Sequence, residues 1–355
     1  MASYAYYKLP DAAHYTKVVQ TAGEPQRLYD YTDLSGKRGF VFAPFAVSEE
    51  CPIVLIEGEM SIESLPPSLS VEEERERVSG LSADTRTPSS DYSRDFRIFH
   101  DQLLNGDFQK IVLSRSMEVK TEETLSPDDL FLKACRMYPH QFVCLVSTPA
   151  SGTWLMATPE VLLEGNGHDW HTVALAGTMR ENTFQISSEE DGSAILQGWS
   201  DKNIREQRLV ATYVNGTLRQ FCDDIREDGP RTIHAGGLVH LRSDFKFSLP
   251  ASEDVGRLIA ALHPTPAVCG LPKSEARSFI LANEYCSRRY YSGFAGQLNP
   301  DGETHLYVSL RCMELLADRC RLYAGGGLLE ESVEQKEWEE TEAKMETMRK
   351  VFLRL

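Results

Sequence analysis

Residues 291–324, YSGFAGQLNPDGETHLYVSLRCMELLADRCRLYA, carry the clearest signal of the fold, because strand-like runs alternate with turn residues. Apolar and β-branched residues predict three strands here, Tyr291 to Leu298, His305 to Leu316 and Arg319 to Ala324. Asn299-Pro300-Asp301-Gly302 supplies the turn between the first two strands. A helical pattern from about Val333 to Leu353 follows the third strand. Consecutive strands with short turns favour antiparallel pairing.

A similar order of elements occurs earlier in the chain, without a residue-level repeat. Four strand-like segments precede a helix from about Asp201 to Cys222: Gln141 to Ser147, Thr153 to Ala157, Val161 to Glu164 and Trp170 to Ala176. Strands followed by a helix in both halves indicate antiparallel sheets layered against helices. We therefore expect an α+β fold and not a parallel doubly wound sheet.

The remaining segments predict how one large domain over residues 1–355 is organised. Short strand signals at 39–45 and 52–58 belong to an N-terminal part, residues 1–60. A polar stretch at 61–93, with Pro66-Pro67 and a charge run, indicates a surface connection. The core then spans 94–355, beginning with a helix that Asn105-Gly106 ends and an extended run from Lys110 to Val119.

Composition excludes several classes of partner. The 53 acidic residues outnumber the 37 basic ones and give a net charge of −16, which repels nucleic acid and anionic membranes. No uncharged apolar run approaches the roughly 20 residues of a membrane span, and the N-terminus lacks a secretion signal. The eight cysteines form no Cys-x-x-Cys pair and are interpreted as reduced core residues. We expect a cytoplasmic protein.

Two helices place charged residues on faces that packing alone would make apolar. In the first helix the apolar stripe through Val210 and Val214 extends back to Glu206 and Asn203. In the last helix a stripe from Val333 to Phe352 passes through Glu337, Glu340 or Thr341, and Lys344. Any one Glu taken alone reads as a solvated helix end. Carboxylates on two inward faces, with few His or Cys nearby, are what Mg²⁺ prefers.

Three further features point to an anionic ligand, each with a plainer alternative. Gly325-Gly326-Gly327 is expected to end a strand, where backbone amides can approach a carboxylate or where a turn needs positive φ. Arg311 lies in an apolar strand and is either an edge residue or paired with an anion. Lys110 is either a solvated strand end or a buried general base.

Six motifs, in order along residues 96–355, resemble those of the chorismate-utilising enzymes, whereas the first 90 residues resemble that family loosely. The motifs are FQKIVLSR at 108–115, ATPE at 157–160, AGT at 176–178, HPTPA at 263–267, YAG at 323–325 and EWEETEAK at 337–344. The resemblance implies two antiparallel sheets flanked by helices, with a Mg²⁺-dependent chorismate site. It also implies a small-molecule partner and a monomer or weak homodimer.

The resemblance assigns roles position by position. Mg²⁺ would be held by Glu206 and Glu340, with Asn203 and Glu337 helping directly or through water. Binding of the substrate carboxylates and ring is assigned to Arg311, Tyr291, Lys344, Gly325, Gly326, Gly327, Ala176, Gly177, Thr178 and Ala267. Lys110 would be the general base and Glu160 the general acid, with His240 near the ring as a third catalytic residue. An apolar surrounding would raise the pKa of Glu160 toward neutrality.

Within the family, these residues imply an isochorismate synthase, which adds water at C2 of chorismate and expels the C4 hydroxyl. A salicylate synthase, which adds a pyruvate elimination, is the close alternative, and the small Ala267 disfavours it. Anthranilate and aminodeoxychorismate synthases are less favoured, since Ala176 stands where the latter carry a nucleophilic lysine. Menaquinone and siderophore synthesis both stay open as destinations of the product. Arg289, Gln207, Gly326 and a missing Pro before the last helix depart from the family pattern.

Overall fold

The computed structural model describes residues 2–66, 88–121, 125–181, 198–235, 237–249 and 254–352. Within them the strands form two nine-stranded sheets in which all pairs are antiparallel. The first sheet has the order β14 (Gly270–Leu271), β7 (Lys110–Lys120), β18 (Arg319–Leu328), β17 (Cys312–Leu315), β9 (Gly152–Thr158), β8 (Phe142–Thr148), β1 (Ser3–Lys8), β2 (His14–Gln20) and β6 (Glu59–Ser64). The second has the order β12 (Arg226–Ala235), β13 (Leu238–Ser248), β11 (Asp169–Arg180), β10 (Val161–Asn166), β16 (Glu303–Val308), β15 (Phe294–Leu298), β4 (Gly39–Ala43), β5 (Ile53–Ile56) and β3 (Gln26–Leu28).

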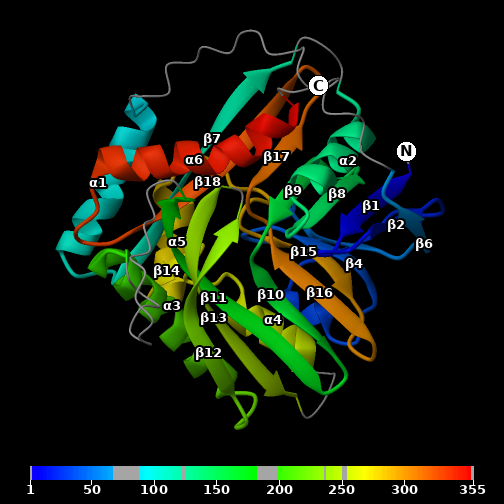
Figure 1. Cartoon of the computed structure of the whole chain (residues 1–355), viewed down its shortest axis with the longest axis horizontal. Coiled ribbons are helices and arrows are strands. Elements are labelled where there is room, and N and C mark those ends of the chain that lie inside the picture. Colours follow the sequence, from blue (N-terminus) through cyan, green and yellow to red (C-terminus); the bar gives the residue numbers. More distant parts are fainter. Residues whose placement is uncertain are drawn as a thin grey trace.

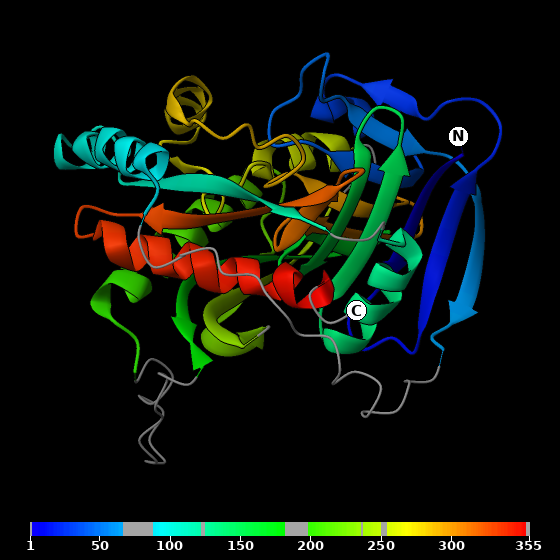
Figure 2. The ribbon, with the colours of Figure 1, turned by 90° about the horizontal axis from the view of Figure 1, so that it is seen from above.

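Helices cover the outer faces of the two sheets. They are α1 (Ser90–Leu104), α2 (Pro127–Met137), α3 (Asp201–Leu218), α4 (Val255–Leu262), α5 (Lys273–Asn283) and α6 (Glu334–Phe352), with a short 3₁₀ helix at Tyr31–Leu34. The apolar residues of α2 and α6 pack on the first sheet, and those of α3 and α4 pack on the second. Figure 1 shows α6 lying along β18 and β7, and Figure 2 shows it from above. The α+β fold expected from the sequence is confirmed.

Aromatic side chains fill the space between the two sheets. Phe142 of β8 stacks on Tyr307 of β16 with ring centroids 4.3 Å apart, and Phe42 of β4 stacks on Tyr290 at the same distance. These rings are almost completely buried, so they contribute a large share of the apolar area that holds the sheets together. Five of the eight cysteines are buried, two of them between the sheets. No helix among the described residues is long and apolar enough to span a membrane.

Several predicted element boundaries agree with the structure to within a few residues. The two charged helices run over Asp201–Leu218 and Glu334–Phe352, and α1 ends at Leu104, before Gly106 with φ of +79°. The predicted surface connection at 61–93 is shorter than expected, because β6 continues to Ser64 and α1 begins at Ser90. Residues 67–87 of that segment lie outside the described residues.

The prediction of one strand from His305 to Leu316 is wrong. The run divides into β16 in the second sheet and β17 in the first, and the chain changes sheets over residues 309–311, where Arg311 has φ of +45°. Both strands are buried on each side, so the sequence shows one continuous apolar run and hides the break. Each predicted series of consecutive strands is therefore shared between the two sheets.

A second crossing between the sheets lies beside the first. The chain leaves β9 of the first sheet and enters β10 of the second over Pro159 and Glu160. Because β9 pairs with β17 and β10 with β16, backbone hydrogen bonds join the crossings: Val308 N–H donates to the Glu160 carbonyl at 2.9 Å, and Ala157 N–H donates to the Arg311 carbonyl at 3.1 Å. The topology thus places Glu160 and Arg311 together at the gap between the sheets.

Candidate active site

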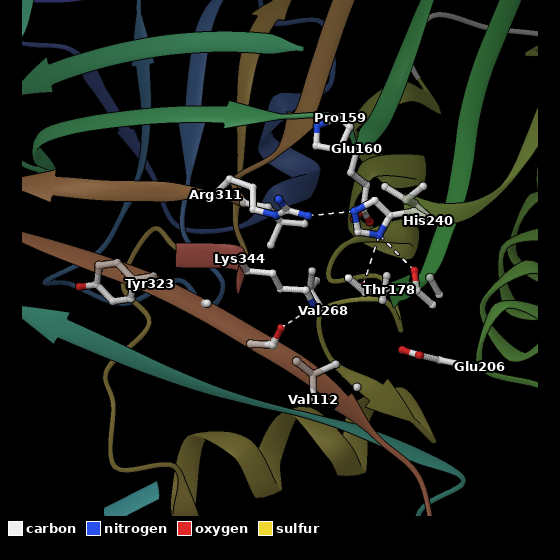
Figure 3. Close-up of a pocket in the computed structure, with 18 of the residues that line it drawn as sticks. Val112, Pro159, Glu160, Thr178, Glu206, His240, Val268, Arg311, Tyr323 and Lys344 are labelled. Atoms are coloured by element: carbon white, nitrogen blue, oxygen red, sulfur yellow. Dashed lines mark hydrogen bonds between the residues drawn. The ribbon is translucent and has the colours of Figure 1, made fainter. Parts of the chain in front are cut away.

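A pocket opens where the two crossings meet (Figure 3). Most residues that the sequence singled out line it: Glu160, Ala176, Gly177, Thr178, Glu206, His240, Ala267, Tyr291, Arg311, Gly325, Gly327 and Lys344. They come from the crossings, from β11, β13, β18, α3 and α6, and from the loops before β14 and β15. Residues that are far apart in the chain therefore meet in one cavity.

The other predicted site residues lie just outside this pocket. Lys110 is fully buried at the start of β7, with Nζ 2.9 Å from Glu206 Oε1. Asn203, Glu337 and Glu340 line a neighbouring cavity between α3 and α6, which shares Thr178 with the first. The two cavities are lined by all of the predicted site residues except Lys110 and Gly326.

Glu160 is a buried carboxyl group at the crossing between β9 and β10. Burial raises the pKa of Glu160 to about 7, although the charges of Lys110 and Lys344 act in the opposite direction. The nearby Thr265 side chain also favours the charged form. The net effect is a carboxyl group that can hold or release a proton near neutral pH.

His240 is held as a neutral ring against Arg311. The Arg311 guanidinium can only donate, so His240 Nε2 accepts its hydrogen bond at 2.9 Å, and Nδ1–H donates to the Gly177 carbonyl at 3.1 Å. Burial and the charge of Arg311 lower the pKa of His240 well below its usual value. A neutral imidazole with both nitrogens occupied is suited to orienting Arg311 and not to donating protons.

Arg311 is buried and lacks a carboxylate partner within ion-pair distance among the described residues. Its other hydrogen bond is to Thr347 Oγ1 at 3.1 Å. Burial lowers the pKa of Arg311 to about 10, so the guanidinium keeps its charge at neutral pH. A buried cation that lines a cavity without a carboxylate in ion-pair contact favours an anionic ligand.

Each candidate metal-ligating glutamate is paired with a lysine. Lys110 pairs with Glu206, Lys344 Nζ lies 2.6 Å from Glu340 Oε1, and Lys202 pairs with Glu337. Burial would raise the pKa of Glu206, but the charges of Lys110 and Lys202 outweigh it and lower that pKa. Lys202 was missed in the sequence, where the only signal was its place beside Asn203 on the same helix.

The glycine run 325–327 lies at the end of strand β18, as predicted, but the alternative of a turn with positive φ is wrong. The three residues pair with β7 inside β18, which continues to Leu328, and none has a positive φ. Their missing side chains make room for the site: a Cβ on Gly327 would lie 2.2 Å from Glu206 Oε1, and one on Gly325 would lie 2.9 Å from the Tyr291 hydroxyl. Gly325 and Gly327 line the pocket, whereas Gly326 does not.

A bulge in β11 shapes the wall that carries residues 176–178. The register with β13 shifts between Ala176 and Thr178, and Gly177 adopts φ of +72°, a conformation that glycine tolerates. The bulge turns the Gly177 carbonyl toward His240, and a Cβ at Gly177 would lie only 3.2 Å from Asn203 Cβ. The glycine therefore allows β11 to approach α3 closely.

The glutamates of α3 and α6 offer the carboxylate oxygens that a hard cation prefers. A Cβ at Gly326 would lie 3.1 Å from Glu337 Oε2 and 3.9 Å from Glu340 Oε1, so glycine leaves open the space that these carboxylates share. Burial and the neighbouring Glu340 raise the pKa of Glu337, as expected for carboxylates that face one another. Each of the three glutamates, Glu206, Glu337 and Glu340, is paired with a lysine. Among the described residues, no group of three His, Cys, Asp or Glu is arranged to hold a metal.

The buried faces of the two helices agree only in part with the predicted stripes. Glu206 and Glu337 are buried as expected, Asn203 and Glu340 are half-buried, and Val333 is 50% exposed. Val333 lies just before α6 begins and is therefore outside the helical repeat. The predicted inward placement of the carboxylates is thus correct, although one apolar residue used to define it faces solvent.

Two departures from the motif pattern have structural explanations. Gln207 is buried on α3, and its Nε2 donates to the Ala174 carbonyl at 3.0 Å, which fixes the helix on β11. Arg289 adopts φ of +49° and forms an ion pair with the buried Glu314 of β17. Neither side chain lines the pocket. The substitutions therefore leave the site groups in place.

Comparisons with known proteins agree with this architecture. A profile of the family described as chorismate binding enzyme matches residues 48–353. The isochorismate synthase DhbC of Bacillus subtilis (strain 168) is 33% identical over 255 residues, covering 70% of this chain and 64% of that protein. The isochorismate synthase EntC of Escherichia coli (strain K12) is 30% identical over 244 residues, covering 68% and 62%. The matches span less than two thirds of either relative.

The fold comparison extends over almost the whole chain. A crystal structure from Bacillus anthracis, provisionally assigned as the 2,3-dihydroxybenzoate-specific isochorismate synthase DhbC, aligns with a TM-score of 0.79 at 25% identity. The alignment covers 98% of this chain and 96% of that one. The N-terminal strands, which resembled known sequences only loosely, are therefore included in the shared fold.

Proposed function

The chain belongs to the chorismate-binding enzyme family, and on that basis we propose that it is an isochorismate synthase acting reversibly on chorismate. One observation carries the proposal: the two proton-transfer groups are at opposite ends of the pocket, Glu160 in its lining and Lys110 buried just behind Glu206. Glu160 lies at one end and Glu206, the ion-pair partner of Lys110, lies at the other (Figure 3). Addition of water on one face of a ring and loss of hydroxide from the other face require that arrangement.

Lys110 is the proposed general base. As the bond between water oxygen and C2 forms, Lys110 Nζ takes the water proton, and the two conjugated ring double bonds shift from C1=C2 to C1=C6 and from C5=C6 to C4=C5. In the ion pair with Glu206 the Lys110 amine is protonated, so it must lose that proton to solvent before it can accept one from water. Glu206 is one of the proposed cation ligands, and its binding to a cation would displace the ammonium and favour this loss. Gly327 lies between the amine and the pocket and leaves the approach open, since a Cβ there would lie 2.7 Å from Lys110 Cε.

Glu160 is the proposed general acid. As the C4–O bond breaks, Glu160 transfers its proton to the departing oxygen, which leaves as water. One water is added and one is lost, so the overall change is an isomerisation. A pKa raised to about 7 by burial supports this role, because an ordinary glutamate would be almost fully ionised near neutral pH.

Substrate anions would be held by the cationic residues of the pocket. Arg311 is oriented by His240, and we assign it to the enolpyruvyl carboxylate together with the nearby Tyr291 hydroxyl. Lys344, fixed on the Gly325 carbonyl at 2.8 Å, and the backbone of Gly325 and Gly327 would assist in carboxylate binding. We assign His240 to positioning Arg311 and not to proton transfer, which revises its expected catalytic role.

Glu206, Glu340 and Glu337 would hold Mg²⁺, with Asn203 beside them. Carboxylate oxygens suit this cation, and the glycine backbone beside them leaves the space free. A bound Mg²⁺ would neutralise and orient the ring carboxylate of the substrate. The contribution of this chain is to supply charged oxygens from α3 and α6 at a common wall of the site.

Product analysis tests the proposal. Purified protein with chorismate and excess Mg²⁺ is expected to form isochorismate, identified by chromatography, with salicylate, measured by fluorescence, at most a minor product. Ala267 lines the pocket and has no hydroxyl to hold a pose suited to pyruvate elimination. EDTA should abolish turnover and added Mg²⁺ should restore it. Salicylate as the main early product would favour the salicylate synthase alternative, and full activity in EDTA would contradict the metal assignment.

A further inference from the structure

Lys202 lies at the beginning of α3 and reaches across to α6, where it pairs with Glu337. The Lys202 side chain is 23% exposed and that of Glu337 is 3% exposed, so the pair is largely removed from water. Both residues line the cavity between α3 and α6, next to the proposed reaction pocket. The pair therefore connects the two helices that carry the candidate cation ligands.

Among the three lysines that neutralise the glutamates, Lys202 is the one with no task in the proposed chemistry. Lys110 is the proposed base, and Lys344 is assigned to substrate binding. The charge of Lys202 interacts favourably with Glu337, with Glu206 and with Glu340. A single positive charge thus acts on the whole set of carboxylates, although it touches only one of them.

We propose that Lys202 is a resident counter-ion that occupies Glu337 in the cation-free protein and sets how tightly the site binds a divalent cation. This inference rests on the proposed Mg²⁺ site. A cation that recruits Glu337 must displace the lysine, and the ammonium group repels it at short range. Without Lys202, less positive charge would offset the repulsion between the buried carboxylates, and this repulsion would destabilise the cation-free fold.

Two opposite effects are therefore expected when Lys202 is replaced by glutamine. The affinity for Mg²⁺ should rise by at least about tenfold, because a competing positive charge is removed from a poorly solvated site. The melting temperature in EDTA should fall, because Glu337 loses its partner. Added Mg²⁺ should then raise the melting temperature of K202Q more than that of the wild type.

Isothermal titration calorimetry with Mg²⁺ alone, without substrate, measures the first effect, and thermal unfolding with and without EDTA measures the second. Lys202→Arg keeps the charge and should behave like the wild type in both. Lys336→Gln is the matched control, because Lys336 lines the same cavity, is exposed and forms no ion pair among the described residues. That variant should change the Mg²⁺ affinity less than twofold.

A measurement on the wild type covers the case in which K202Q does not fold. Lysine labelling with an acylating reagent, read out by peptide mass spectrometry, reports the accessibility of each amine. Labelling of Lys202 should increase on addition of Mg²⁺, with a midpoint that matches the calorimetric Kd, whereas labelling of Lys336 should stay constant. Unchanged labelling of Lys202 at saturating Mg²⁺ would overturn the proposal.

The outcomes separate this inference from the proposed function. If the wild type binds Mg²⁺ and K202Q binds it no more tightly, Lys202 is not a competing counter-ion, while the metal assignment stands. If K202Q binds Mg²⁺ and the wild type does not at millimolar concentration, both are supported. If neither protein binds Mg²⁺, the inference falls together with the metal site.

Discussion

Glu160 and Lys110 are both buried, and the proposed reaction uses each in one proton transfer. Glu160→Gln and Lys110→Ala should therefore each lower kcat by about 10²- to 10⁴-fold, with a much smaller change in KM. Steady-state kinetics with chorismate measure both parameters. Lys120→Ala, at the exposed end of the same strand, is the control and should be close to wild type. Near-normal kcat in either site variant would contradict the role of that residue.

The raised pKa of Glu160 also predicts a pH dependence. The proposed acid must be protonated, so kcat for chorismate should fall as pH rises through about 7. Folding stability follows the same sign: the folded pKa lies above the unfolded value of 4.5, so the contribution of Glu160 is lost as pH rises from 4.5 to about 7. The melting temperature of E160Q relative to wild type should accordingly increase over this range. A constant difference would contradict the raised pKa.

The glycines of β18 are explained by the side chains beside them. In Gly327→Ala the new methyl group would press on Glu206 and on Lys110, so activity should fall at least about tenfold while the protein stays folded. Gly216→Ala is the control: nothing lies within 4 Å of a Cβ there, and alanine is favoured in the interior of α3. Kinetics and circular dichroism together test this. Full activity in G327A would show that the close approach is not needed.

Three neighbouring strands form a second cluster of charges, apart from the pocket. Glu164 of β10 pairs in register with His171 of β11 and with His305 of β16. Burial would raise the pKa of Glu164, but hydrogen bonds from both histidines and from Tyr307 outweigh it and lower that pKa to about 2. Burial opposes the charged form of His171, yet Asp244 and Glu164 raise its pKa. The same balance, with Glu164 and Glu303, raises the pKa of His305.

These cross-strand pairs predict the pH range in which the second sheet is most stable. The contribution of Glu164 to folding stability is present above about pH 4.5 and is lost as pH falls toward 2. The contribution of the two histidines is present below pH 6.5 and is lost as pH rises through their raised pKa values. Glu164→Gln should therefore lower the free energy of unfolding by roughly 2 kcal/mol, and this loss should be largest between pH 4.5 and 6.5. Denaturant unfolding across this range measures it, and Glu303→Gln, at an exposed side chain, should cost far less.

The N-terminal strands are integral parts of both sheets, although their sequence resembles the family only loosely. β1 pairs with β8 in the first sheet, and β4 pairs with β15 in the second. Tyr7, Phe40 and Phe42 of these strands are buried in the core between the sheets. Removing them would expose β8 and β15 as new edges and uncover the aromatic core.

A chain that begins at residue 94 should therefore fail to fold. Each buried aromatic side chain contributes roughly 1.5–3 kcal/mol, so the loss of several is comparable to the whole stability of a typical domain. Near-ultraviolet circular dichroism and thermal unfolding of the truncated protein would show no fixed aromatic environment and no cooperative transition. A cooperative transition in that protein would mean that residues 94–355 form an independent unit.

The chain sequence was enough to predict the α+β class, the main helices, and the inward carboxylates of α3 and α6. These depend on local periodicity, which the order of residues contains directly. The motif resemblance added the residues of the pocket, and the structure brings them together around the two crossings. Lys202 could not be found in this way, because its importance comes from a partner 135 positions away.

The sheet crossings and the glycine run depend on contacts across the fold. A run that is buried on both sides looks the same whether or not it changes sheets, so β16 and β17 read as one strand, and Arg311 appeared to lie inside it. Gly325, Gly326 and Gly327 suggested a turn, whereas glycine is needed at these positions because side chains from other elements lie too close for a Cβ. Local residue patterns thus specify helices, strands and buried faces. Pairing between distant strands places Glu160 beside Arg311, because hydrogen bonds between β9 and β17 and between β10 and β16 align the two crossings.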